Sequence, residues 1–415
     1  MKHKALLTCI FISLITSCTN RESSMMHSNT IDIEAGLQNT TKFNISDFGK
    51  SIRYIPLETT DESLIGNKPV FKVLKNHIVV EVNNRCLLFD KKDGRFISAI
   101  GHIGQDPEAY SSVSCWTDEK EEFLYFIRQP NQLIKYDMKG TFCGKTEFPS
   151  SPGLASYYLL TDLEIIGHYT GINNSGNLVL GFFDKEGVLL DTVPLLTSEI
   201  ENSFDNIESI SVTKGDFTYG NWGKTGVIII DYKNDKKQII TANAATLWKN
   251  KKEIRFKESF VDTIYTIVNH KLIPSITFHT GKWHWPEQER TSKNKTNERI
   301  FIADVSENNT FIFFQCIKGF YSDEPVLYNG LYNKKTGETK LAKNSDVIKD
   351  NLTGFMPFNP QNMSTSGEFA SLIEAGNIME WLEEHSEAKE NKKLAFLKEF
   401  NEDMNPVIVL VEEAD

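Results

Sequence analysis

Residues 86–101 read Cys-Leu-Leu-Phe-Asp-Lys-Lys-Asp-Gly-Arg-Phe-Ile-Ser-Ala-Ile-Gly. An apolar run leads to Asp90, a polar turn containing Asp93 and Gly94 follows, and a second apolar run leads away. Asp-Gly between two apolar runs is a strong β-hairpin signal, because glycine readily takes the left-handed backbone conformation that a tight turn needs. We therefore expect these residues to form two antiparallel strands.

The same pattern recurs along the chain at a constant interval. Residues 133–142 read Leu-Ile-Lys-Tyr-Asp-Met-Lys-Gly-Thr-Phe, and residues 180–189 read Leu-Gly-Phe-Phe-Asp-Lys-Glu-Gly-Val-Leu. Asp90, Asp137 and Asp184 stand 47 residues apart, and a further 47 residues leads to Asp231 in another apolar run. A repeat of about 40–50 residues built from short strands is typical of β-propellers with four-stranded blades.

Six segments have the strand content of a blade. They are residues 70–100, 113–148, 157–195, 207–241, 255–278 and 299–341. In the fifth segment the hairpin turn at Asn269 and His270 comes earlier than the 47-residue interval predicts, so the repeat is less regular there. We predict an all-β fold, a six-bladed β-propeller whose blades occupy residues 43–345.

Residues 346–415 are predicted to form a helical segment and a ring-closing strand. Apolar side chains within residues 368–385 lie near helical spacing, and Leu394, Leu397 and Phe400 make a shorter set. Residues 407–411, Val-Ile-Val-Leu-Val, indicate a buried strand. Because a propeller leaves no blade edge exposed, we expect this strand, or the strands of residues 43–57, to complete a blade begun at the other terminus. The helices are expected outside or below the ring.

Residues 1–17 predict a lipoprotein signal peptide. Lys2 and Lys4 precede an apolar run that is too short to span a bilayer of about 30 Å as a helix. The run ends in Ile-Thr-Ser-Cys18, which resembles a bacterial lipobox, so Cys18 is predicted to carry the lipid; an ordinary signal peptide with a chance cysteine is the alternative. Residues 18–42 are predicted as a flexible tether. The expected location is the bacterial cell envelope, at the outer membrane, with the lipid as the only membrane contact.

Charge and cysteine spacing exclude two classes of function. The formal net charge is −11, so the chain is repelled by phosphate backbones and no nucleic-acid partner is predicted. Cysteines beyond the signal and the lipobox are Cys86, Cys115, Cys143 and Cys316. None lies in a Cys-x-x-Cys pair or near a histidine at ligand spacing, so no metal site is predicted. We expect these cysteines to be buried free thiols, and one disulfide among them is the alternative.

Four pieces of the chain resemble the six-bladed, NHL-like β-propeller lipoproteins of Bacteroidetes. These pieces are residues 55–60 with 64–66, the hairpin at 89–96, the crossover at 100–110, and the closing run at 402–410. The resemblance spans about residues 43–412. Asp106 and Glu108 replace two glycines of the family's crossover, and Ala109 stands where the family has a glutamate. The resemblance implies the fold and an exported location, and it implies no catalytic residue and no cofactor.

Two polar motifs are interpreted as structural. Asp90, Asp137 and Asp184 invite a calcium site, but each stands at the same place in its own blade, where an aspartate caps its own turn. The crossover contains His102 and Asp106, which suit acid–base chemistry, yet its position between blades favours a clasp. The basic run at residues 249–257 is interpreted as a solvated loop.

The candidate recognition site is Trp283-His284-Trp285, at the start of an otherwise polar insertion. Flat aromatic faces stack on sugar rings or cover peptide side chains, and the alternative is that both tryptophans anchor the loop. The sequence thus predicts a binding or scaffold module for a glycan, peptide or protein partner. The alternative is a propeller hydrolase or lyase with its site in the central funnel.

Overall fold

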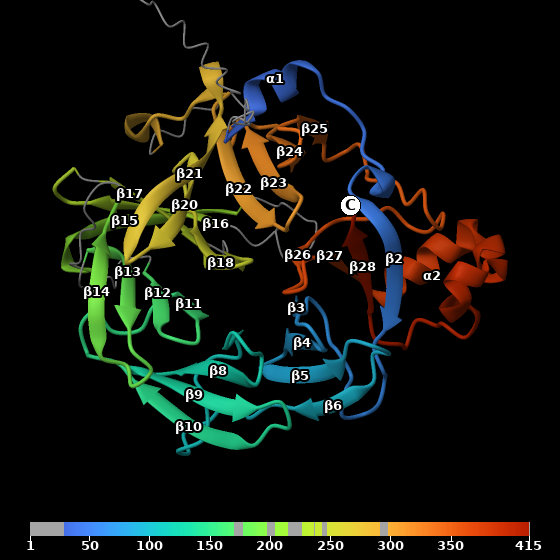
Figure 1. The fold of residues 1–415 in the computed structure, drawn as a ribbon, viewed down its shortest axis with the longest axis horizontal. Helices are drawn as coiled ribbons and strands as arrows, with labels where there is room; N and C mark the ends of the chain where they lie inside the picture. Colours follow the sequence, from blue (N-terminus) through green and yellow to red (C-terminus); the bar gives the residue numbers. More distant parts are fainter. Residues whose placement is uncertain are drawn as a thin grey trace, which may run out of the picture.

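The computed structural model describes residues 29–169, 177–196, 204–214, 226–235, 237–242, 247–290 and 298–414. Residues 1–28, including the predicted signal peptide and Cys18, lie outside the described residues. Within the described part, strands dominate and form seven sheets, accompanied by two α-helices and a few short 3-10 helices. The fold is all-β and β-propeller-like, with its sheets arranged around a central axis (Figure 1).

Six sheets follow one another around the axis, and each is named here by its order. Sheet 1 contains β3 (Val70–Val73), β4 (His77–Val82), β5 (Arg85–Asp90) and β6 (Phe96–Ala99). Sheet 2 contains β7 (Cys115–Thr117), β8 (Phe123–Arg128), β9 (Gln132–Asp137) and β10 (Phe142–Glu147). Sheet 3 contains β11 (Tyr157–Leu160), β12 (Ile165–His168), β13 (Leu178–Phe183) and β14 (Leu189–Pro194).

The remaining sheets of this set come from the second half of the chain and from its ends. Sheet 4 contains β18 (Leu247–Asn250), β19 (Glu253–Phe256), β20 (Thr263–Val268), β21 (Lys271–His279) and β1 (Thr30–Asp32). Sheet 5 contains β22 (Ile300–Glu307), β23 (Phe311–Lys318), β24 (Val326–Asn333) and β25 (Thr339–Lys343). Sheet 6 contains β26 (Asn362–Met363), β27 (Phe369–Ile373), β28 (Val407–Glu413) and β2 (Gly49–Pro56).

Buried apolar clusters join neighbouring sheets in pairs. Sheet 1 packs on sheet 2, sheet 2 on sheet 3, and sheet 3 directly on sheet 4. Sheet 4 packs on sheet 5, sheet 5 on sheet 6, and sheet 6 on sheet 1. Because both faces of each sheet are covered in this way, central strands are able to be buried along their whole length, as in β13, where all six residues are buried.

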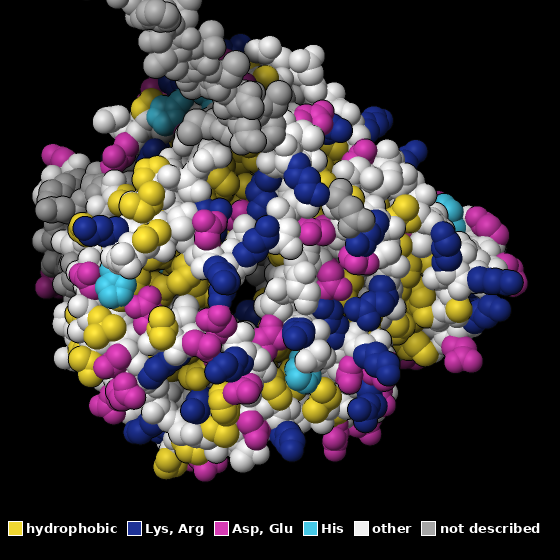
Figure 2. Space-filling model, in the orientation of Figure 1, with side chains coloured by type: hydrophobic (Ala, Val, Ile, Leu, Met, Phe, Trp, Pro, Cys, Tyr) yellow, Lys and Arg dark blue, Asp and Glu magenta, His cyan; other side chains and the backbone are white. Residues whose placement is uncertain are grey.

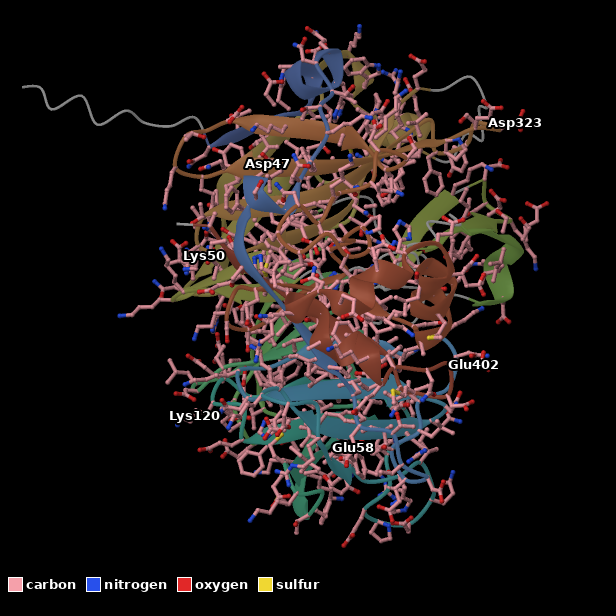
Figure 3. The ribbon with its side chains drawn as sticks, turned by 90° about the vertical axis from the view of Figure 1, so that its right-hand side faces the viewer. Asp47, Lys50, Glu58, Lys120, Asp323 and Glu402 are labelled. Carbon is pink, nitrogen blue, oxygen red and sulfur yellow. The ribbon has the colours of Figure 1, made fainter. Side chains whose placement is uncertain are left out.

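The seventh sheet corrects the prediction for residues 207–241. It contains β15 (Ile207–Lys214), β16 (Gly226–Tyr232) and β17 (Lys237–Ala242), and we name it the accessory sheet. It is not inserted between sheets 3 and 4; its Ile229 lies in a cluster with Phe301 and Trp285. In side view it lies on the same side as Asp323, opposite Lys120 (Figure 3). The predicted fourth blade is therefore wrong, because strand pattern alone does not reveal which neighbour covers a sheet.

The two ends of the chain meet in sheet 6. β2 pairs antiparallel with β28, which places Ile52 opposite Val411. The predicted strand at residues 407–411 is confirmed. Residues 369–373, however, form strand β27 rather than helix, because they pair with β28 along their whole length. Tertiary pairing here overrides an apolar spacing that also suits a helix.

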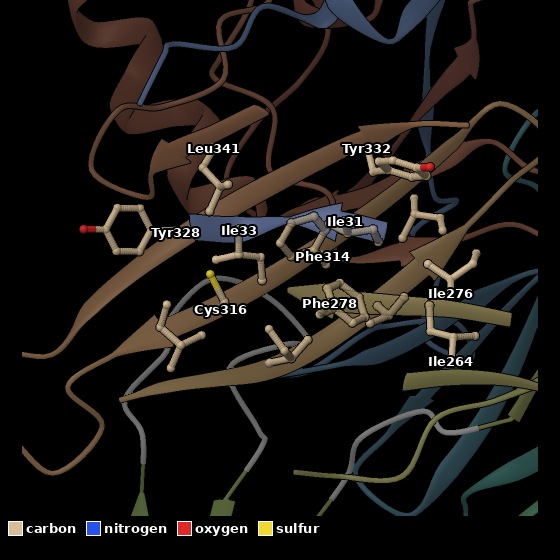
Figure 4. Packing of buried hydrophobic residues seen from close by; sticks show 14 residues of the cluster. Ile31, Ile33, Ile264, Ile276, Phe278, Phe314, Cys316, Tyr328, Tyr332 and Leu341 are labelled. Atoms are coloured by element: carbon tan, nitrogen blue, oxygen red, sulfur yellow. The ribbon is translucent and has the colours of Figure 1, made fainter. Parts of the chain in front are cut away.

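Part of the predicted tether belongs to the fold. β1 pairs in parallel with β21, and α1 (Ile33–Gln38) follows it directly. Ile31 and Ile33 are fully buried in the cluster between sheets 4 and 5, beside Phe278 and Phe314 (Figure 4). Burying two such side chains stabilises the fold by roughly 1.5–3 kcal/mol each. Residues 30–38 are therefore structural, and the predicted boundary at residue 42 is wrong.

Helical segments lie outside sheet 6 (Figure 1). They are α2 (Ala375–Glu384) and the 3-10 helices at Ser386–Glu390 and Lys392–Lys398. Their apolar faces enclose Ile378, Leu394 and Leu397, and the cluster reaches Val407 and Tyr54 of sheet 6. The helices thus cover the outer side of one sheet. None of the helices in the described residues is long and apolar enough to cross a membrane.

The hairpin turns have the predicted chemistry. Asp90 Oδ1 accepts a hydrogen bond from the backbone N–H of Lys92 at 2.7 Å, and Asp137 Oδ1 accepts one from Lys139 at 2.9 Å. Gly94 has φ of 78° and lies against the backbone of Pro56, so a side chain at this position meets the neighbouring sheet. These aspartates cap turns, as predicted.

Candidate functional site

The inner strands of sheets 1 to 6 surround the axis of the ring. β3, β7, β11, β18, β22 and β26 are each the edge strand of their sheet. β11 contacts β7 and β18, and β26 contacts β3 and β22. On the face seen in Figure 2 the molecule is hollowed near this axis, and Lys, Arg, Asp and Glu side chains gather around the hollow. Ionisable groups of several sheets therefore share one central region.

One wall of this region contains an ion pair within sheet 1, at the boundary with sheet 2. The Lys72 ammonium on β3 contacts the buried carboxylate of Glu81 on β4, and it donates a hydrogen bond to the backbone oxygen of Cys115 at 2.8 Å. Burial alone lowers the pKa of Lys72, but the electrostatic effects of Cys115 and Glu81 outweigh it, so this pKa is raised. Lys72 therefore stays protonated at every physiological pH.

Tyr157 and Asp304 belong to sheets that are not neighbours, and yet they influence each other. Tyr157 begins β11 of sheet 3, and Asp304 lies in the middle of β22 of sheet 5. Burial raises the pKa of the Tyr157 hydroxyl; Lys72 opposes this, and Asp304 adds to it. Because charges interact more strongly where water is scarce, Lys72 and Asp304 both act on the Tyr157 hydroxyl from their different sheets.

Asp304 departs strongly from an ordinary aspartate. Burial raises its pKa to about 7, against the opposing effects of the Val305 N–H, 2.6 Å from Oδ1, and of Lys257. A carboxyl group with such a pKa holds its proton in about half of the molecules near neutral pH. Perturbed pKa values of this kind cluster at functional sites, although structural networks also produce them.

Lys257 is the basic counterpart of Asp304. Its side chain is buried just after β19, where burial lowers its pKa to about 8, and Asp262, Glu258 and Asp304 oppose that shift. Glu258 also lies 3.3 Å from Nε2 of the buried His168 in sheet 3. Acidic and basic groups of sheets 3, 4 and 5 thus meet on the Lys257 side of the axis. We name Lys72, Tyr157, Lys257 and Asp304 the central cluster.

A second set of contacts bridges sheets 2 and 4 at the ends of their inner strands. Glu119, in the turn after β7, forms an ion pair with Lys249 of β18 and accepts a hydrogen bond from the Asp162 N–H at 3.1 Å. The hydrogen bond from Lys249 lowers the pKa of Glu119. Glu119 thus connects sheet 2 both to sheet 4 and to the turn between β11 and β12 of sheet 3.

The predicted recognition motif separates into three different environments. Trp285 is buried against Phe260, Phe320 and Tyr321, so its ring anchors the loop. Trp283 is half-buried, with the Lys282 ammonium 4.6 Å and the Lys318 ammonium 5.4 Å from the centre of its ring. Only His284 is largely exposed. The burial of Trp285 agrees with the interpretation that this tryptophan anchors the loop.

Asp262 connects this motif with the central cluster. Its Oδ2 lies 3.0 Å from Nδ1 of His284, and its charge also acts on Lys257. Asp262 therefore links the motif to Lys257, although the two come from different elements.

The sequence interpretation missed the central cluster. The basic run at residues 249–257 was expected to be a solvated loop, but it forms β18 and β19, with Arg255 and Lys257 buried. Asp304 carried a usable signal, since it interrupts the apolar strand Ile-Phe-Ile-Ala-Asp-Val. Lys72 and Tyr157 carried none, because a single polar or aromatic residue in a strand is ordinary.

The cluster suits binding of charged groups and the holding of a proton. The amines of Lys72 and Lys257 and the partly protonated carboxyl group of Asp304 interact strongly with a charged ligand where water is restricted. Among the described residues, no group of three or more His, Cys, Asp or Glu side chains is arranged to hold a metal ion.

A comparison with known protein families identifies the family of this chain. A family model described as "Domain of unknown function (DUF4934)" matches residues 28–412. The chain belongs to this family. The match starts just before β1 and ends in β28, so it covers all seven sheets, the accessory sheet included.

Solved structures resemble this member of the family at low sequence identity. A protein from Bacteroides fragilis, described as exported, has a TM-score of 0.65 at 15% identity, covering 93% of this chain and 99% of that one. The RRP9 WD40 repeats have a TM-score of 0.41 at 9% identity, covering 89% and 99%. The extracellular domain of a hybrid two-component system from B. thetaiotaomicron has a TM-score of 0.35 at 12% identity, covering 78% and 40%. The comparison with curated proteins finds no match.

Proposed function

We propose that this chain is an exported, lipid-anchored β-propeller that binds a ligand at the axis of its ring. Sheets 1 to 6 are the six blades of a closed propeller, and the accessory sheet is an insertion in the sequence that follows the third blade and packs outside the row of blades. Six buried clusters support this arrangement, since they join each of these sheets to the next and the last to the first.

The observation that carries the proposal is the convergence of charged side chains from non-neighbouring sheets. Stability does not require Lys257 and Asp304 in this position, because burial works against the charged form of both. Buried ionisable groups with such shifted pKa values cluster at functional sites. The axis of a propeller is also where loops of all blades meet, and is a common location of ligand sites.

The mixed charges favour a peptide over a neutral glycan. Lys257 is able to pair with a ligand carboxylate, and Asp304 and Glu258 are able to accept hydrogen bonds from a ligand amine, as at a peptide terminus. A neutral sugar makes hydrogen bonds but leaves these charges uncompensated. We therefore propose a peptide or an exposed peptide segment of an envelope protein as the partner.

Binding to defined probes tests this proposal. Full-length protein in detergent is titrated against a fluorescently labelled library of short peptides and against neutral oligosaccharides, with polarisation as the readout. We expect micromolar binding to peptides, weakened at least tenfold by Lys257→Met together with Asp304→Asn. Lys42→Met, at an exposed lysine outside the central cluster, is the matched control and keeps full affinity. Binding only to oligosaccharides, or binding unaffected by the double substitution, would contradict the proposal.

The pKa values of the same residues favour a second function, a hydrolase or lyase. Asp304, with a pKa of about 7, and Lys257, with a pKa of about 8, are able to exchange protons near neutral pH. Turnover of chromogenic peptide and glycoside substrates, abolished by Asp304→Asn, would support this function. No turnover by the wild-type protein across the panel would leave binding as the proposed activity.

A further inference from the structure

Two of the four thiols outside the signal segment face each other across the boundary between sheets 1 and 2. Cys86 lies on β5 and Cys115 on β7, and both are buried in the cluster that joins these sheets. Cys86 is the cross-strand partner of Glu81, so the two side chains point to the same side of sheet 1. Oε1 of the same Glu81 lies 3.4 Å from the Cys115 Sγ, so Cys86 and Cys115 lie on either side of one buried carboxylate.

Charged groups surround the Cys115 thiol. Its Sγ lies 3.4 Å from Glu81 Oε1 and 4.0 Å from Lys72 Nζ, and its backbone N–H donates to the same Glu81 oxygen at 3.1 Å. The carboxylate is placed to accept the proton of the thiol, and the ammonium to stabilise a thiolate. Cys316 is also buried, but its pKa is raised by burial alone, and Cys143 is exposed on β10.

We propose that Cys86 and Cys115 are a redox pair that forms a disulfide bond between sheets 1 and 2. Both are free thiols in the structure, which is then the reduced form of the pair. The oxidant is a disulfide, either a small molecule or an envelope oxidoreductase. The bond staples two neighbouring blades within 29 residues of chain, beside the Lys72 wall of the central cluster.

The exchange proceeds in two balanced steps. The Cys115 thiolate attacks the external disulfide, forming a mixed disulfide and releasing one thiolate. The Cys86 thiolate then attacks the Cys115 sulfur, which forms the Cys86–Cys115 bond and releases the second thiolate. Two protons leave the protein thiols, and two electrons pass to the external disulfide.

Mapping of disulfides in the full-length protein tests this inference. The protein is purified from the envelope in detergent, unfolded in an alkylating agent without reductant, and digested for mass spectrometry. A second sample is refolded with oxidised glutathione first. We expect a linked peptide pair containing Cys86 and Cys115, lighter by two hydrogens than the two thiol peptides. Cys143 and Cys316 are expected to be alkylated.

Matched variants and stability complete the test. Cys316→Ser keeps the linked pair, and Cys86→Ser leaves Cys115 fully alkylated. Reducing the wild-type protein is expected to lower its Tm by roughly 5 °C, a shift that Cys86→Ser does not show. Recovery of both cysteines as alkylated thiols in both samples would overturn the inference. So would a disulfide from either of them to a different cysteine.

Discussion

Ile52 and Val411 are paired across β2 and β28, although 359 positions separate them in the chain. Their pairing joins the first strand after the N-terminal helix to the last strand of the molecule. Sheet 6 is therefore complete only when both ends of the chain are present. The buried residues of β28 connect this sheet with sheets 5 and 1.

Ile408→Ala tests this dependence. Ile408 is fully buried between sheets 6 and 1, so the substitution leaves a cavity, and we expect a loss of about 2–5 kcal/mol in the free energy of unfolding. Ile273→Ala is the control, because that side chain is half-exposed on β21, and its expected cost is within about 0.5 kcal/mol. Urea unfolding monitored by tryptophan fluorescence measures both. Equal effects would show that the ends do not meet as described.

Shortening the N-terminus separates the tether from the fold. A chain starting at residue 29 keeps β1 and α1 and should unfold at the same temperature as the longer chain. A chain starting at residue 39 loses Ile31 and Ile33 from the cluster between sheets 4 and 5, so a clear fall in Tm is expected. Calorimetry of the two chains checks this. An unchanged Tm for the shorter chain would contradict the structural role of residues 30–38.

Asp304 makes stability depend on pH in an unusual direction. Its folded pKa of about 7 lies above its unfolded value, so its contribution is fully present below about pH 4 and is lost as pH rises to about 7. Asp304→Asn removes this loss. We therefore expect the free energy of unfolding to fall less between pH 4 and pH 8 in the variant than in the wild-type protein, by on the order of 2 kcal/mol. Urea unfolding at several pH values measures the difference.

Asp403→Asn is the control for this experiment. Asp403 is exposed at the surface, so its substitution should leave the pH profile of the wild-type protein unchanged. If Asp304→Asn has the same profile as Asp403→Asn, the burial of Asp304 does not raise its pKa.

The two tryptophans of the insertion are expected to respond differently. Trp285→Ala empties a buried aromatic position and should cost about 3–5 kcal/mol of stability. Trp283→Ala removes a half-buried ring at the surface and should cost far less, while it weakens peptide binding if ligands approach past His284. Unfolding and polarisation assays on the same two variants compare these effects. A severe loss of stability for Trp283→Ala would show that both tryptophans anchor the loop.

Membrane attachment is expected to depend on Cys18 alone. Cys18→Ala should move the protein from the membrane fraction to the soluble fraction of the envelope, because a lipid-free chain has no other predicted anchor. Fractionation followed by immunoblotting measures the distribution, with Cys143→Ala as the control cysteine. A variant that stays with membranes would refute lipidation as the anchor.

Local pattern explains why much of this fold was predictable. The hairpin at residues 86–101, its repeats, and the aspartates that cap their own turns depend on neighbours in sequence. The strand at residues 407–411 was equally clear, because five consecutive apolar β-branched or aliphatic residues suit only a buried strand or helix interior, and Pro406 disfavours a helix running through it.

Tertiary structure alone decided which surfaces meet. The accessory sheet has the same strand pattern as a blade, yet sheet 3 packs directly on sheet 4, because apolar faces do not encode a particular neighbour. Ile31 and Ile33 are core residues only because β1 pairs with the edge strand β21. Lys257 and Asp304 are 47 residues apart in the chain, and their shared environment at the axis arises from the closure of the sheets around it. Local chemistry specifies the strands and turns, and only long-range packing brings the charges together.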